Sequence, residues 1–258
     1  MMDVIKRLVH IFRAARPNSP AVVPLLLPDG PIYAIGDIHG QLHQLENLVR
    51  TLWNDAAARQ EPQLRIAPLG DMIDRGPDSA GVIAWMLAPP PNIEILPLRG
   101  NHEAMFLDFL KAPDPRAPWL RTGGAETLAS YGLYPDQIAG AGRHLSAMLD
   151  AYVPASHRDF LESLPLARIS PEHLLVHAGI DPARSITAQD AQALLWIRKP
   201  FLEHDGPFER VVVHGHTPAK TPHLGPWRIG IDTGAGHGRA LCAVRLESGC
   251  APVFFRAS

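Results

Sequence analysis

Carboxylate, imidazole and amide side chains follow several short apolar runs of the sequence. Six of these residues offer oxygen or imidazole donor atoms: Asp37, His39, Asp71, Asn101, His177 and His216. A set without thiolates suits Mn, Fe or Zn ions better than a structural zinc site. It is large enough for two ions that share a bridging carboxylate. Two ions about 3.5–4 Å apart can activate a bridging hydroxide for an in-line displacement.

Four further residues fit the remaining roles in such a site. His102 could protonate a leaving oxygen, and Asp74 could hold the His102 imidazole in one tautomer. Arg75 and Arg198 could each make a forked contact with phosphate oxygens. Together with the donor set, these residue types indicate chemistry on a phosphate ester.

The elements that carry these residues are predicted as strands that end in polar loops. Apolar runs of strand length cover residues 32–35, 64–69, 93–98, 173–176, 210–213, 227–231, 240–246 and 252–255. Helical patterns cover residues 41–58, 79–87, 103–111 and 145–164. Pro97 predicts that the run 93–98 lies near a sheet edge or a bulge. Ligands of open α/β sheets bind beyond the carboxyl ends of strands, so the polar clusters are expected to form the site there.

The first 30 residues differ in character from the rest of the chain. Residues 1–16 predict a basic amphipathic helix, which could dock on the domain or make peripheral contact with a membrane surface. This stretch is too short to span a membrane, and it has no cleavage site for export. Four prolines then predict a stiff linker up to Gly30: Pro17, Pro20, Pro24 and Pro28. We therefore divide the chain into residues 1–30, helix and linker, and residues 31–258, a catalytic domain.

Composition limits the class of protein. A chain of 258 residues that is 46% hydrophobic can bury the core of one large α/β domain. A net charge of -2 gives no global field that would attract nucleic acid, so no nucleic-acid partner is expected. The two cysteines, Cys242 and Cys250, form no metal pattern and fit a reducing compartment, which favours a cytoplasmic location.

Three motifs in this order resemble the signature of the phosphoprotein phosphatase family of calcineurin-like metallophosphoesterases. They are GDIHG at residues 36–40, GDMIDRG at 70–76 and GNHE at 100–103. HAG at 177–179 and GHT at 215–217 match the remaining metal motifs of that family. The resemblance implies an α/β fold with a central β-sandwich flanked by α-helices. It also implies two divalent metal ions, with Mn favoured over Fe or Zn.

The resemblance further implies two metal sites that share one carboxylate. The first metal would be held by Asp37, His39 and Asp71. The second would be held by Asp71, Asn101, His177 and His216. The absence of a long C-terminal extension and the Ala-Gly pair after His177 are typical of the compact bacterial members.

Catalytic and substrate-binding roles also follow from the resemblance. His102 would be the general acid and Asp74 its partner. Arg75, Asn101 and Arg198 would bind the substrate. Arg198 resembles an arginine that follows a Leu-Trp-x pattern in the bacteriophage lambda and bacterial members.

Three functions stay open at this point. The first is a protein serine/threonine phosphatase, with phosphotyrosine as a further substrate, acting on a phosphoprotein or phosphopeptide. The second is a symmetrical dinucleoside tetraphosphatase, whose family members usually carry a small residue where this chain has Asp74. The third is a metal-dead scaffold that only binds phosphorylated partners. It would lack a ligand, whereas all six ligand positions are filled here.

Overall fold

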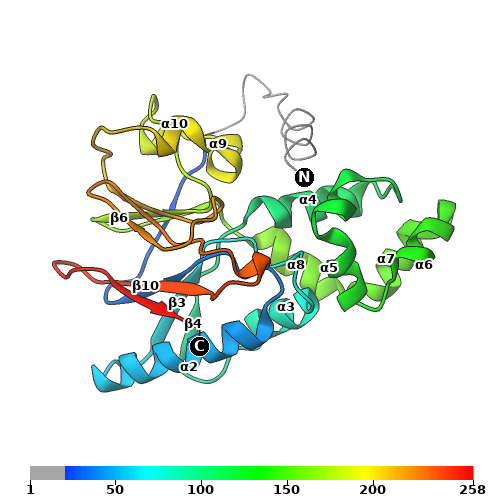
Figure 1. Ribbon diagram of the computed structural model, residues 1–258, viewed down its shortest axis with the longest axis horizontal. Helices are drawn as coiled ribbons and strands as arrows, with labels where there is room; N and C mark the ends of the chain where they lie inside the picture. The colour runs from blue at the N-terminus through cyan, green and yellow to red at the C-terminus, as the bar shows by residue number, and fades with distance from the viewer. Residues whose placement is uncertain (1–20, 258) are drawn as a thin grey trace.

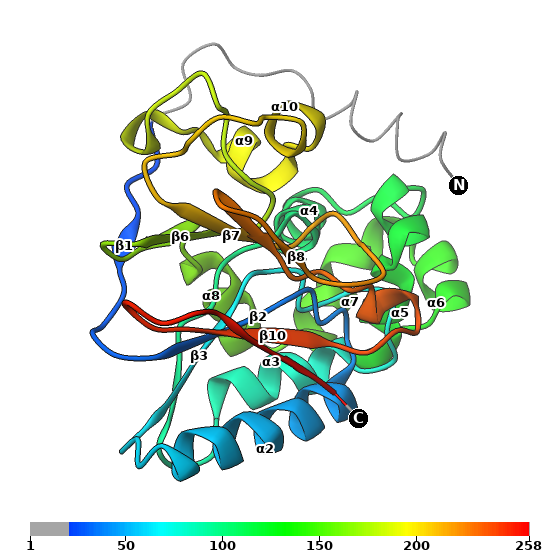
Figure 2. The ribbon, with the colours of Figure 1, turned by 60° about the vertical axis from the view of Figure 1, so that its left-hand side comes forward.

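Two β-sheets lie face to face in the computed structural model, with helices on their outer faces (Figures 1 and 2). The structure describes residues 21–257, so the expected helix over residues 1–16 lies outside the described residues. The predicted α/β fold with a central β-sandwich is therefore confirmed.

The five-stranded sheet has the order β11-β10-β2-β3-β4. Its strands are β2 (Ile32–Ile35), β3 (Leu64–Pro68), β4 (Ile93–Ile95), β10 (Cys242–Leu246) and β11 (Val253–Arg256). The first three are parallel, and β10 and β11 run antiparallel to their neighbours. The crossovers are α2 (Leu42–Ala58) and α3 (Ser79–Leu87). β4 lies at the edge of the sheet, as Pro97 predicts, because proline cannot donate a ladder hydrogen bond.

The six-stranded sheet has the order β1-β5-β6-β7-β9-β8. Its strands are β1 (Leu25–Leu26), β5 (Ala167–Ile169), β6 (His173–Val176), β7 (Val211–His214), β8 (His223–Leu224) and β9 (Arg228–Gly230). The helices α9 (Ala191–Trp196) and α10 (Lys199–Leu202) cover its outer face (Figure 1). β1 lies where the sequence predicts linker, and it pairs in parallel with β5 at the sheet edge. The described half of that segment is thus part of the sandwich.

A helical layer lies between β4 and β5 along the chain, beside the sandwich (Figure 2). It contains α4 (Asn101–Lys111), α5 (Gly124–Ser130), α6 (Pro135–Gly140), α7 (Leu145–Tyr152) and α8 (Ala155–Ser163). Short 3-10 turns complete the fold: η1 (Pro118–Thr122), η2 (Gly142–His144), η3 (Ile186–Ala188) and η4 (Ala235–His237). The expected single helix over 145–164 is wrong in one respect, since it divides into α7 and α8. Pro154 sits between them, where it lacks the amide that a continuous helix needs.

Alternation along the strands builds the core on both faces of each sheet. Tyr33 and Ile35 pack against the helices, whereas Ile32 and Ala34 point between the sheets toward residues such as Leu175. Because the carboxyl ends of β2 and β3 in one sheet and of β6, β7 and β9 in the other lie at the same edge of the sandwich, the loops that follow them converge. That edge is where the candidate site lies.

Candidate metal centre

All six predicted ligand residues come together at this edge. None is more than 6% exposed, so the site is shielded from water: Asp37, His39, Asp71, Asn101, His177 and His216. Two groups of side chains offer donor atoms within 4.8 Å of one another, and both contain Asp71. One group joins Asp71 to His39 and His102, and the other joins Asp71 to His177 and His216.

Asp71 lies between the two groups, with one carboxylate oxygen toward each. Its Oδ1 is 3.4 Å from Nε2 of His177. Its Oδ2 is 3.7 Å from Nε2 of His39 and 3.8 Å from Nε2 of His102. Asp37 is placed differently, because both of its oxygens accept from the backbone amide of His216 at 3.1 Å. The geometry thus suits a bridging role for Asp71.

The imidazoles present unprotonated nitrogen atoms to the centre of the site. Nδ1 of His177 donates to the carbonyl of Leu69 at 2.9 Å, which leaves the lone pair on Nε2 free. This Nε2 lies 2.8 Å from Oδ1 of Asn101, so two acceptor atoms face each other. A cation between them would remove that repulsion. The donor set therefore fits a divalent metal ion.

Burial keeps the imidazoles of the site unprotonated, and this is the form that binds a metal ion. Desolvation lowers the pKa of His177 to about 3 and that of His39 and His216 well below the ordinary value. Burial raises the pKa of Asp37 and Asp71 well above the ordinary value, and repulsion from Asp232 and Glu103, respectively, adds to the shift. A divalent cation would hold those two carboxyl groups ionised, since an opposite charge favours the charged form.

The backbone is strained where it presents these side chains. Seven non-glycine residues among those described have positive φ, and five of them lie in the site: His39, Asp71, Asp74, Arg75 and His216. Such conformations cost on the order of 1–3 kcal/mol each and persist only where the surroundings enforce them. The sharp turns after the strands aim the side chains at one point.

Glu103, at the start of α4, enforces two of these turns. Its buried carboxylate accepts from the amides of Gly100 at 2.7 Å and Asp71 at 2.9 Å through Oε2. Its Oε1 accepts from the amides of Met72 at 2.7 Å and Ile73 at 3.3 Å. The loops after β3 and β4 are thus joined through one side chain. Glu103 is the last residue of the GNHE motif, and the sequence alone did not indicate this role.

The predicted acid pair forms a short hydrogen bond inside the protein. Nδ1 of His102 lies 2.6 Å from Oδ2 of Asp74. Asp74 also accepts from Nε1 of Trp119 at 2.7 Å and from Oγ1 of Thr127 at 2.6 Å. Burial raises the pKa of Asp74 to about 7, and the donors Thr127 and Trp119 oppose this shift. Trp119 and Thr127 lie in η1 and α5, within residues 116–132, a stretch whose sequence predicts helix with a loop near the site.

Two guanidinium groups face the buried donor atoms. Nη1 of Arg75 lies 2.6 Å from Nε2 of His39, and its Nη2 lies 3.0 Å from Nε2 of His102. Arg198 donates from Nε to Nε2 of His216 at 3.1 Å. Both predicted arginines are therefore at the site, with their charges where an anionic substrate would approach.

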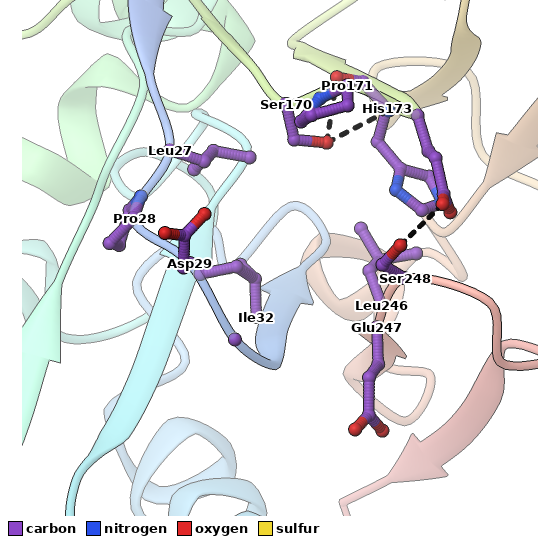
Figure 3. A pocket seen from close by; sticks show the side chains of 12 residues that line it. Leu27, Pro28, Asp29, Ile32, Ser170, Pro171, His173, Leu246, Glu247 and Ser248 are labelled. Atoms are coloured by element: carbon purple, nitrogen blue, oxygen red, sulfur yellow. Dashed lines mark hydrogen bonds between the residues drawn. The ribbon is translucent and has the colours of Figure 1, made fainter.

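A separate cavity of about 370 Å³ lies at the other end of the sandwich (Figure 3). It is lined by the turns before β2, between β5 and β6, and after β10, and it includes Asp29, Ser170 and His173. None of the predicted site residues lines it. A smaller cavity of about 170 Å³ lies between α4 and α9, beside Trp196, whose ring is 6.3 Å from that of His216.

Comparison with known proteins identifies the family. The calcineurin-like phosphoesterase family matches residues 30–239, so the chain belongs to that family and is a hydrolase. The resemblance to bacterial phosphoprotein phosphatases is confirmed. Within the described residues 21–257, no helix has the length and apolar composition needed to cross a membrane.

Individual relatives carry two kinds of name. The chain is 28% identical over 230 residues to "Serine/threonine-protein phosphatase 1" of Salmonella typhimurium, covering 84% of this chain and 92% of the relative. It is 30% identical over 248 residues to "Bis(5'-nucleosyl)-tetraphosphatase PrpE [asymmetrical]" of Bacillus anthracis, covering 82% and 88%. Among solved structures, a "putative diadenosine tetraphosphatase" aligns with a TM-score of 0.63 at 22% identity, covering 93% of this chain and 99% of that one. At that identity the structural likeness concerns the fold.

Proposed function

We propose that this hydrolase is a metal-dependent phosphomonoesterase that dephosphorylates serine and threonine residues of proteins, with phosphotyrosine as a further substrate. The observation that carries the proposal is the 2.6 Å bond between His102 and Asp74. A serine alkoxide is a poor leaving group, and a positioned acid contributes about 10²–10⁴-fold to such a departure. A nucleotide phosphate leaves more easily, so it gains less from the same pair.

The six residues with oxygen and imidazole donor atoms would hold two metal ions. One ion would be held by Asp37, His39 and Asp71. The other would be held by Asp71, Asn101, His177 and His216. Mn²⁺ suits this nitrogen and oxygen set, with Fe and Zn as alternatives. When bound, the two ions supply an activated water and neutralise charge on the phosphate.

The side chains of the site then have separate tasks. Arg75, Arg198 and Asn101 bind and orient the phosphate, and a guanidinium suits this because it can donate two parallel hydrogen bonds. His102 donates the proton to the departing oxygen. Asp74 orients the imidazole and stabilises its positive form, and the donors Trp119 and Thr127 hold Asp74 in place.

Dinucleoside tetraphosphate hydrolysis is the second candidate function. The name of the PrpE relative favours it. The metal-dead scaffold has no support of this kind, because all six donor residues are present and adjacent to one another.

A turnover panel tests the proposal. It compares a phosphothreonine peptide, a phosphotyrosine peptide and diadenosine tetraphosphate with the full chain at one Mn²⁺ concentration. We expect kcat/KM to be highest for the phosphothreonine peptide. A higher kcat/KM for diadenosine tetraphosphate, with asymmetric or symmetric products identified by chromatography, would replace the first function with the second.

A further inference from the structure

Asp232 lies next to the metal centre and has no role in the ligand set proposed above. It follows β9 and is 6% exposed, as buried as His216. Its Oδ1 accepts from the amide of Gly234 at 2.9 Å, and this is the only amide or side-chain N–H that the described residues direct at the carboxylate. A buried carboxylate with so few donors is costly unless a positive charge is near.

The second feature is the contact between Asp232 and Asp37. The two carboxyl groups lie close enough for their charges to repel each other, although they come from different sheets. The close approach is fixed by the backbone, because a Cβ at Gly36 would collide with the carbonyl oxygen of Ile231. Asp232 is therefore held against the corner of the site formed by Asp37.

The segment that begins at Asp232 also covers the imidazole beside that corner. The turn η4 brings Gly236 so close to His39 that a Cβ there would lie 2.5 Å from Cδ2 of the ring. Burial raises the pKa of Asp232, and Arg75 and His237 lie near enough for their charges to oppose this shift. Asp232 is thus part of the same charged volume as His39.

Charge in this volume is not balanced by the protein alone. Three carboxyl groups face it, from Asp37, Asp71 and Asp232, and among the described residues only two guanidinium groups oppose them, those of Arg75 and Arg198. Yet the Arg75 guanidinium contacts the nitrogens of His39 and His102, and the Arg198 guanidinium contacts His216. The carboxylates are left to bind another cation. The unpaired acceptors of His177 and Asn101 independently indicate the same need.

We infer that Asp232 is a further acidic residue of the metal centre, which strengthens binding of the divalent ion held by Asp37, His39 and Asp71. The inference rests on the proposed metal centre. Loss of a carboxylate that supports a ligand typically weakens metal binding by about 10–100-fold. If Asp232 only stabilised the turn that follows β9, it would need just the hydrogen bond from the Gly234 amide. An asparagine side chain can also accept that hydrogen bond.

The test is a calorimetric titration of Mn²⁺ into the metal-free full chain, with no substrate. Asp232→Asn removes the charge and keeps an oxygen for the Gly234 amide. Asp29→Asn is the matched control, because it makes the same charge change at the exposed rim of the remote cavity (Figure 3). We expect two Mn²⁺ sites in the wild type and in Asp29→Asn. In Asp232→Asn we expect one site to weaken about 10–100-fold and the other to change less than about threefold.

The outcomes separate this inference from the proposed function. Equal Mn²⁺ affinities in the wild type and Asp232→Asn would overturn the inference alone. A wild-type protein that binds no Mn²⁺ would overturn the metal centre itself. If Asp232→Asn melts earlier than the wild type in the metal-free state, Asp232→Ser replaces it, since a serine hydroxyl can also accept from the Gly234 amide.

Discussion

Nη1 of Arg75 lies 2.6 Å from Nε2 of His39, on the nitrogen that the proposed first metal would use. The Nδ1 of His39 donates to the carbonyl of Ile73 at 2.8 Å, so Nε2 carries the lone pair. Nη2 of the same guanidinium lies 3.0 Å from Nε2 of His102. Arg75 is thus placed between a candidate metal ligand and the proposed acid, where we expect it to contact the phosphate of a substrate.

The first prediction is that activity requires added divalent metal. Metal-free protein should show no turnover, and Mn²⁺ should restore more activity than Zn²⁺ or Mg²⁺, because the donor set has no thiolate. The measurement is hydrolysis of an aryl phosphate after chelation and stepwise addition of each ion. Full activity in chelated protein, with metal content verified as absent, would rule out the two-metal centre.

The second prediction separates catalysis from metal binding at Arg75. Arg75→Ala should lower kcat/KM by about 10²–10⁴-fold, because two charge-assisted hydrogen bonds to phosphate are lost at about 1.5–3 kcal/mol each. Its Mn²⁺ affinity should stay equal or rise, since the variant removes a positive charge from the neighbourhood of the ligands. Kinetics and Mn²⁺ calorimetry on the same preparation measure both effects. Weaker Mn²⁺ binding would show that Arg75 supports the ligands.

The third prediction concerns the bond between His102 and Asp74. His102→Asn should damage alkyl phosphates more than p-nitrophenyl phosphate, by a large part of the roughly 10²–10⁴-fold that a positioned acid contributes. Asp74→Asn should act in the same direction with a smaller effect, because it only orients and stabilises the imidazole. The measurement is kcat/KM for both substrate types, with metal analysis of each variant.

Asp71→Asn is the contrasting variant for this third prediction. It removes the carboxylate that both groups of donor atoms share, so it should depress all substrates alike and reduce metal content. Equal losses on both substrates for His102→Asn, with metals retained, would remove His102 from the acid role.

The fourth prediction tests the clamp made by Glu103. In the wild type, several backbone N–H groups donate to the Glu103 carboxylate. In Glu103→Gln, a side-chain N–H₂ group faces some of these donors. The variant should therefore lower the free energy of unfolding by about 3 kcal/mol. Denaturant unfolding of the metal-free protein measures this. Glu126→Gln is the matched control, since Glu126 is exposed in the first turn of α5. Unchanged stability in Glu103→Gln would exclude the clamp.

The fifth prediction is that residues 1–20 are dispensable for the chemistry. The donor residues all lie beyond Gly30, and deletion at residue 20 leaves β1 and its pairing with β5 in place. Turnover of a small aryl phosphate should change less than about tenfold, or roughly 1.4 kcal/mol. Retention on anionic vesicles at low salt, compared between the full and shortened chains, tests the membrane-surface interpretation of residues 1–16.

The sequence by itself determined which residues form the centre and which elements carry them. Strand and helix patterns depend on local periodicity, so β2, β3, α3 and β6 appear where the apolar runs predict them. The ligand atoms that residues such as Asp71 and His177 offer depend on the side chain itself, so they are known from the sequence. The edge position of β4 followed from a single proline for the same reason.

Only the tertiary structure decided which residues support those donors. Trp119 and Thr127 reach Asp74 across 45 and 53 residues, and Asp232 meets Asp37 from the other sheet. Such contacts depend on how two sheets and a helical layer pack. Hydrophobic periodicity, by contrast, indicates only which face of each element is buried. A buried polar side chain needs a partner, but its sequence position does not say where that partner lies. The packing of distant segments makes that choice, because it alone sets which donors and charges share one volume shielded from water.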